Sequence, residues 1–180
     1  MVIFKGQNHM LTKADIEKYF IAEKHESLVF LVIGIAVVVL ALIFYFTAKT
    51  QIYRGAALPL LILGLMQTVA GYTVVMRSDD QRINQVYAYD MNPDQLKTIE
   101  LTRMRKVKTS FLIYRWIEIG AFVTGLILVM LFFKQPLKSY WLGFGITFTI
   151  MAAELFIADF IAEKRAVHYI SLLEEFNKKA

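Results

Sequence analysis

Four apolar runs, each long enough to cross a bilayer, take up about half of this 180-residue sequence. They cover residues 28–47, 56–76, 110–133 and 139–162. The hydrocarbon core of a membrane is about 30 Å thick, and about 20 apolar helical residues cross it. The sequence therefore predicts an all-α membrane protein, a four-transmembrane-helix bundle with helices extended into the cytoplasm.

Basic residues are distributed unevenly between the two sides that four spans create. Fifteen of the 20 Lys and Arg residues lie before the first span, between the second and third, or after the fourth, and only four lie in the other two loops. Cytoplasmic flanks of membrane helices carry such an excess. We predict an integral protein of a membrane such as the bacterial inner membrane, with both termini cytoplasmic. The net charge of +5 then reflects topology, and we expect no nucleic-acid partner.

The segments on the basic side read as helices that continue beyond the bilayer, at 12–26, 79–109 and 163–180. Asn92 and Pro93 form a helix start, from which one helix can run to Phe133 over about 60 Å. Ser78 and Gln81 resemble a capping box, which leaves open a break in the second helix. These extensions either pack on one another or lie on the lipid surface. Their matched lengths favour packing, so residues 1–180 are expected to form a single domain.

Small residues recur at heptad spacing within the spans. They include Gly34 and Ala41 in the first, Gly64 and Gly71 in the second, and Ala121 and Gly125 in the third. In lipid, helices associate through close backbone approach rather than through the hydrophobic effect. We expect these stripes to be the inner seams of the bundle, with an oligomer interface as the weaker alternative.

Polar and ionisable residues inside the spans are the sharpest functional signal. They are Gln67, Arg115, Glu118, Glu154 and Asp159. The helical rise places Gln67, Glu118 and Glu154 at one level, each about 12–14 Å inside the cytoplasmic boundary. A lone charge at mid-bilayer costs about 2.5–3.5 kcal/mol on insertion scales, so we expect the cluster to face protein.

Arg115 is the single cation of this cluster, against the two carboxylates Glu118 and Glu154 and a possible third, Asp159, near the boundary. It cannot neutralise them all unless a cytoplasmic cation such as Arg77, Lys164 or Arg165 reaches in. The unpaired carboxylate is then left to be protonated, to bind a cation or to face a water-filled cavity. We assign that role to Glu154. The cluster as a whole has three interpretations: a structural group that fixes helix register, an ion or proton site, and a catalytic or ligand site.

The residues that several kinds of functional site require are missing from this sequence. The sequence has no cysteine, which excludes disulfides and thiolate metal sites. His9, His25 and His168 lie outside the spans, which argues against haem ligation. Phosphate-loop, dinucleotide and zinc-protease motifs are absent. We expect no cofactor and no metal, and a non-catalytic role is favoured over an enzymatic one.

A basic run precedes the third span and contains Arg103, Arg105, Lys106 and Lys108. Cations beside a membrane attract anionic lipid by about 1 kcal/mol each. The run is interpreted as ordinary topogenic charge, with an anionic-lipid contact as the alternative.

Three functions follow from these observations. The favoured one is a non-catalytic bundle that is structural, binds a partner or forms an oligomer, with membrane lipids and either a second copy or a cytoplasmic protein as partners. The alternative is a proton- or cation-conducting transport protein that uses the polar cluster. The second alternative is a lipid-processing membrane enzyme. A cavity that reaches Glu154 would separate an inert salt bridge from a working site.

Overall fold

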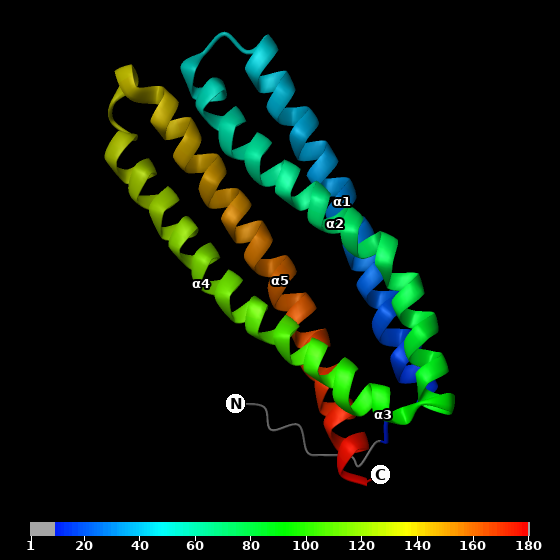
Figure 1. Cartoon of the computed structure of the whole chain (residues 1–180). Helices are drawn as coiled ribbons and strands as arrows, with labels where there is room; N and C mark the ends of the chain where they lie inside the picture. The colour runs from blue at the N-terminus through cyan, green and yellow to red at the C-terminus, as the bar shows by residue number, and fades with distance from the viewer. Residues whose placement is uncertain (1–9, 180) are drawn as a thin grey trace.

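The computed structural model describes residues 10–179, and this part of the chain contains helices and no strand. Residues 1–9 and 180 lie outside this part, and with them His9 and the last residue of the predicted 163–180 extension. Four long helices form the fold: α1 (Lys13–Thr47), α2 (Gln51–Met91), α4 (Leu101–Phe132) and α5 (Ser139–Lys179) (Figure 1). Each contains a stretch long and apolar enough to cross a membrane.

Helix α1 begins at a capping box. The backbone N–H of Asp15 donates to Thr12 Oγ1 at 3.3 Å, and the Thr12 N–H donates to Asp15 Oδ2 at 2.9 Å. These two bonds satisfy backbone donors that the first helical turn leaves free. With 35 residues, α1 continues the predicted 12–26 helix into the first apolar run without interruption.

Helix α2 is also continuous, so the break considered at Ser78 does not occur. The Ser78 hydroxyl donates to the Val74 carbonyl at 2.7 Å and to Glu23 Oε2 at 3.3 Å. It therefore bonds within the helix and across to α1 instead of capping a new helix.

The third long helical segment starts after Asn92, as predicted, but it is not one regular helix. The short helix α3 (Pro93–Gln95) is followed by η1 (Leu96–Glu100), a π-helical turn that leads into α4. Asn92 makes no side-chain capping bond. A π turn adds a residue to the local repeat, and here Leu96, Glu100 and Leu101 are all buried.

The long helices form two hairpins. Helix α1 packs along α2, α4 packs along α5, and α2 and α5 join the hairpins (Figure 1). We call residues 28–76 and 110–162 the apolar half, and residues 10–27, 77–109 and 163–179 the polar half. In the apolar half the four helices stand in the order α1, α2, α5, α4 in Figure 1, and the outer helices α1 and α4 make no extensive contact with each other.

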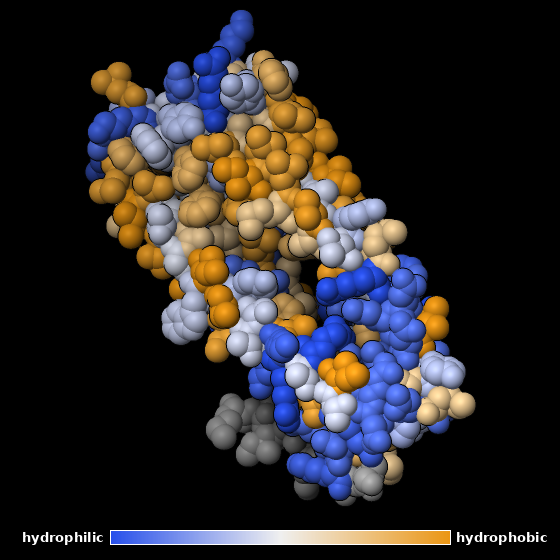
Figure 2. All heavy atoms as spheres, viewed as in Figure 1, coloured by the Kyte–Doolittle hydropathy of each residue, from blue (hydrophilic) through white to orange (hydrophobic). Residues whose placement is uncertain are grey.

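Glycines form the seams of the apolar half, as predicted for Gly34, Gly64, Gly71 and Gly125. Gly34 lies against the backbone of Thr68 on α2, and Gly125 against Thr149 on α5. Large apolar side chains point outward instead: Phe46 is 77% exposed and Met130 is 80% exposed. Figure 2 shows this apolar surface below a hydrophilic upper tip, and mostly hydrophilic residues over the lower part of the molecule.

The polar half has a conventional hydrophobic core. All the long helices and η1 contribute to it, and its buried members include Leu11, Ile16, Phe20, Leu96, Met104 and Leu173. The rings of Tyr19 and Tyr169 stack at 4.3 Å between centroids and join α1 to α5. The extensions therefore pack on one another, as the sequence analysis favoured, and do not lie apart as separate surface helices.

Candidate binding cavity

A cavity of about 470 Å³ lies between the two hairpins, where the apolar half meets the polar half. Its position follows from a change of partner along α5. Towards the short connections of the apolar half, α5 packs on α2, where the Thr147 hydroxyl donates to the Ala56 carbonyl at 3.3 Å. In the polar half it packs on α1 through the tyrosine stack. Between these contacts the hairpins separate, and Figure 2 shows a hollow at this level.

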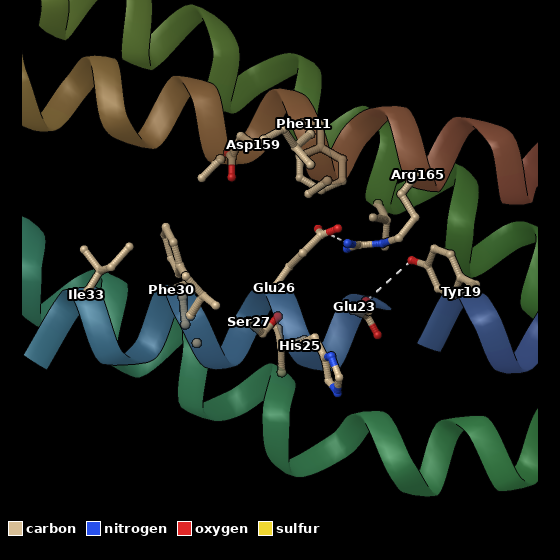
Figure 3. Close-up of a pocket in the computed structure, with 18 of the residues that line it drawn as sticks. Tyr19, Glu23, His25, Glu26, Ser27, Phe30, Ile33, Phe111, Asp159 and Arg165 are labelled. Atoms are coloured by element: carbon tan, nitrogen blue, oxygen red, sulfur yellow. Dashed lines mark hydrogen bonds and ion pairs between the residues drawn. The ribbon is translucent and has the colours of Figure 1, made fainter. Parts of the chain in front are cut away.

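The walls of the cavity are mostly apolar and come from all four long helices. The apolar lining includes Phe30, Ile33, Val74, Phe111, Ala158 and Ile161. Phe30 on α1 and Phe111 on α4 lie on opposite sides of the cavity (Figure 3). A molecule with an apolar body therefore finds matching surface on both hairpins.

Glu154 lines the end of the cavity within the apolar half. Its Oε1 accepts a hydrogen bond from Gln67 Nε2 at 2.9 Å, whereas its Oε2 and the Gln67 Oε1 have no hydrogen-bond partner among residues 10–178. Gln67 is only 1% exposed. Beyond this pair, Met151, Leu60 and Ala41 form a buried cluster. The cavity thus ends at a carboxyl group with unused hydrogen-bonding capacity.

The other end of the cavity carries ionic and polar groups of the polar half. Arg165 on α5 forms an ion pair with Glu26 on α1 (Figure 3). Glu23 accepts hydrogen bonds from the hydroxyls of Tyr19 at 3.5 Å and Ser78 at 3.3 Å. Burial, and next the charge of Glu23, raises the pKa of Tyr19 far above its ordinary value. Tyr19 therefore remains a neutral donor to Glu23.

A second polar group lies between α4 and α5, where Arg115 forms an ion pair with Glu163. Beside this pair, Arg115, Glu118, Asp159 and Glu163 surround a void of about 10 Å³. Glu118 and Asp159 are within hydrogen-bonding reach of each other, and Glu118 Oε2 has no partner in the hydrogen-bond network of the described residues. Asp159 lines both this void and the large cavity.

The structure thus divides the predicted five-residue cluster into two groups, Gln67 with Glu154, and Arg115 with Glu118 and Asp159. Glu118 lies beside Asp159 rather than at the level of Glu154. Arg115 is paired with Glu163, an acid that the sequence analysis did not include. No Lys or Arg within residues 10–178 forms an ion pair with Glu118, Glu154 or Asp159.

Two residues of the basic run before the third span form ion pairs within the fold. Arg103 binds Glu100 through two hydrogen bonds of 2.7 Å, and the Glu100 side chain is buried. Arg105 pairs with Glu174 at 2.8 Å. Lys106 and Lys108 are exposed. The anionic-lipid contact stays a prediction, and it rests chiefly on these two lysines.

Several residues that line the cavity are not among the predicted site residues; they include Tyr19, Phe30 and Phe111. Phe30 and Phe111 look like ordinary members of apolar runs, so composition gives no signal for them. Within residues 10–179 no three His, Asp or Glu side chains are grouped to hold a metal ion. The arrangement can hold an amphiphilic molecule and present carboxyl groups to its polar part.

Comparison of the chain with models of protein families, with curated proteins and with solved structures finds no match. The functional interpretation therefore depends on the geometry of the cavity.

Proposed function

We propose that this chain is an integral protein of the bacterial inner membrane that binds a small amphiphilic ligand without catalysis. Its four apolar runs cross the bilayer, and the polar half with both chain ends lies in the cytoplasm. Support comes from four sufficiently long apolar helices, from the outward-facing apolar side chains and from the excess of basic residues in the polar half.

The observation that carries the ligand-binding role is the cavity that reaches Glu154. Ligand sites are commonly concave, mostly apolar and equipped with a few polar groups, within about 300–1,000 Å³. This cavity fits that description, since its apolar walls lead to a carboxyl group with a free acceptor. A purely structural salt bridge would need neither the space nor the unpartnered atom.

A cation- or proton-transporting role is the second candidate. It is favoured by three acids, Glu118, Glu154 and Asp159, that have no Lys or Arg ion-pair partner within residues 10–178. Against simple conduction, α2 and α5 are in close contact beyond Glu154, where Gly55 meets Tyr140 and Gly143 meets Ile52. Transport would require these helices to separate, so binding is the role that this conformation supports best.

Lipid processing has the weakest support, because the two hydroxyls that donate to the Glu23 carboxylate belong to Tyr19 and Ser78, whose side chains are buried. A homo-oligomer or a cytoplasmic protein partner remains a prediction, as does the contact with membrane lipids. These roles are compatible with a ligand in the cavity, since they would use outer surfaces of the helices.

The absence of cysteine allows a direct test with single-cysteine variants. Ala158→Cys places a thiol on the cavity wall, whereas Ala152→Cys, on the same helix, places one in a packed seam where the alanine is buried. In membrane vesicles, a charged, membrane-impermeant methanethiosulfonate reagent should modify Ala158→Cys from the cytoplasmic side and leave Ala152→Cys unmodified. Equal protection of both thiols would refute an accessible cavity.

Two more thiols test the topology in the same vesicles. Ser171→Cys lies in the polar half, and Ser139→Cys lies at the opposite end of α5. We expect the impermeant reagent to modify Ser171→Cys in inside-out vesicles and Ser139→Cys in right-side-out vesicles. Modification of both from the same side would contradict the proposed span.

A further inference from the structure

We infer that the ligand is a lipophilic organic cation, with Glu154 as its counter-charge and Phe30 and Phe111 as its aromatic walls. This inference rests on the proposed ligand-binding function of the cavity and names the chemical class of its ligand.

The charges that line the cavity favour a cation. Four acids lie on its wall, against the cations Arg77 and Arg165 and the imidazole of His25; the acids are Glu23, Glu26, Glu154 and Asp159. Arg165 is already paired with Glu26. At the end within the apolar half, the ionisable residues of the lining are the acids Glu154 and Asp159, and Gln67 donates to Glu154. An anionic group placed there would meet Glu154 in surroundings of low dielectric, where like charges repel strongly.

The apolar lining determines what kind of cation fits. Phe30 and Phe111 lie across the cavity from each other (Figure 3), and aromatic faces attract cations that are partly desolvated. An inorganic ion is a poor match. Ca²⁺ takes six to eight oxygen ligands and Mg²⁺ requires about six, whereas the end within the apolar half offers Glu154 and the more distant Asp159. A bulky cation with a delocalised or shielded charge uses both the volume and the single carboxylate.

The position of the cavity also suits such a molecule. Its lining runs from Ile33, Gly71 and Glu154 in the apolar half to His25, Arg77 and Arg165 in the polar half. An amphiphilic cation gathers at the membrane–water boundary, because that location solvates its charge while its body contacts hydrocarbon. It can therefore enter the cavity at the level where it already resides.

The test uses two probes of the same shape and opposite charge, tetraphenylphosphonium and tetraphenylborate, with the full chain in lipid nanodiscs. Equilibrium dialysis should show saturable binding of tetraphenylphosphonium and much weaker binding of tetraphenylborate. Glu154→Gln should weaken tetraphenylphosphonium binding by at least about tenfold, and Glu154→Asp, which keeps the charge, should restore part of it. Glu17→Gln is the matched control, because it removes an exposed carboxylate of the polar half and should change binding less than about twofold.

The outcomes separate this inference from the proposed function on which it rests. Ala158→Trp fills the cavity and should abolish binding of the cation; circular dichroism and gel filtration show whether each variant is folded. Unchanged affinity in folded Glu154→Gln, equal binding of the two probes, or no binding of tetraphenylphosphonium overturns the cationic ligand. Unchanged binding in folded Ala158→Trp shows that the cavity is not the site, and then the proposed function fails as well.

Discussion

Leu131 and Leu173 are both leucines in long α-helices, yet Leu131 is 58% exposed and Leu173 is 0% exposed. The difference belongs to the two halves that contain them. In the apolar half, large side chains point outward and glycines pack inside. In the polar half, apolar side chains form the core and charged residues cover it. One set of continuous helices thus follows lipid packing rules at one end and aqueous rules at the other.

The cavity lies where these two sets of rules meet. Glycine seams bring α2 and α5 into close contact in the apolar half, whereas large rings hold α1 and α5 together in the polar half. Straight helices cannot satisfy both contacts without separating between them. The space left there is lined by acids of the apolar half beside ion-paired residues of the polar half. The site is therefore a consequence of the change in packing.

The largest expected effect comes from truncating the same residue type in each half. Leu173→Ala removes a fully buried side chain from the core of the polar half and should cost about 2–5 kcal/mol. Leu131→Ala changes an outward-facing side chain and should cost less than about 0.5 kcal/mol. Reversible unfolding in mixed detergent–SDS micelles, followed by circular dichroism, measures both. Similar losses for the two variants would break the distinction between the halves.

The apolar half should be sensitive to added rather than removed side-chain atoms, because its helices pack through glycines. A Cβ at Gly143 would collide with the backbone of Ile52, whereas a Cβ at Gly120 meets nothing within 4 Å. Gly143→Ala should therefore destabilise the protein by about 1–3 kcal/mol through overpacking. Gly120→Ala should change stability by less than about 1 kcal/mol. The same micelle unfolding experiment applies, and tolerance of Gly143→Ala would mean that α2 and α5 are not held by close backbone contact.

Alkaline pH should act on the polar half through Tyr169. Burial, and next the charge of Glu100, raises the pKa of Tyr169 far above its ordinary value. Its contribution to stability is complete below about pH 10, where the unfolded chain also keeps tyrosine protonated, and it decreases as the pH rises further. At pH 11 the loss is about 1.4 kcal/mol.

Tyr169→Phe isolates this effect, because the Tyr169 hydroxyl is buried and has no hydrogen-bond partner in the described part of the chain. At pH 7 the variant should be as stable as the parent, and between pH 10 and 11 it should lose less stability. Tyr87→Phe is the control, since it removes an exposed tyrosine of the same half. Parallel stability curves for Tyr169→Phe and the parent would contradict the expected role of burial.

Much of this fold can be predicted because its causes are local. Four long apolar runs identify the spanning segments, and the spacing of Ile16, Tyr19 and Phe20 indicates a helix with one buried face. Asn92 and Pro93 indicate where the third long helical segment begins. Each of these signals depends on residues that are close together in the sequence.

The site could be predicted only in part, because its geometry depends on how distant helices are aligned. Helical rise placed Glu118 level with Glu154, but the axial register of α4 on α5 brings Glu118 beside Asp159 instead. The same register pairs Arg115 with Glu163. The π turn at η1 and the change of partner along α5 are likewise set by packing between helices. The sequence indicates Glu154 as the acid left without a cation, because the predicted intramembrane cluster contains more acids than bases, and in the structure Glu154 lines the cavity.

The smallest expected effect concerns the start of α1 in the polar half. Thr12→Ala removes the capping box with Asp15 and should cost about 1 kcal/mol, mostly by fraying the first turns. Thr109→Ala is the control, because its hydroxyl donates only to a carbonyl within its own helix. Hydrogen exchange should quicken at residues 13–16 in Thr12→Ala and stay unchanged over 28–47. If protection falls along all of α1, the helix unfolds as one unit and its two halves are coupled; if it falls only at the first turns, the aqueous core holds α1 independently of the lipid-facing seams.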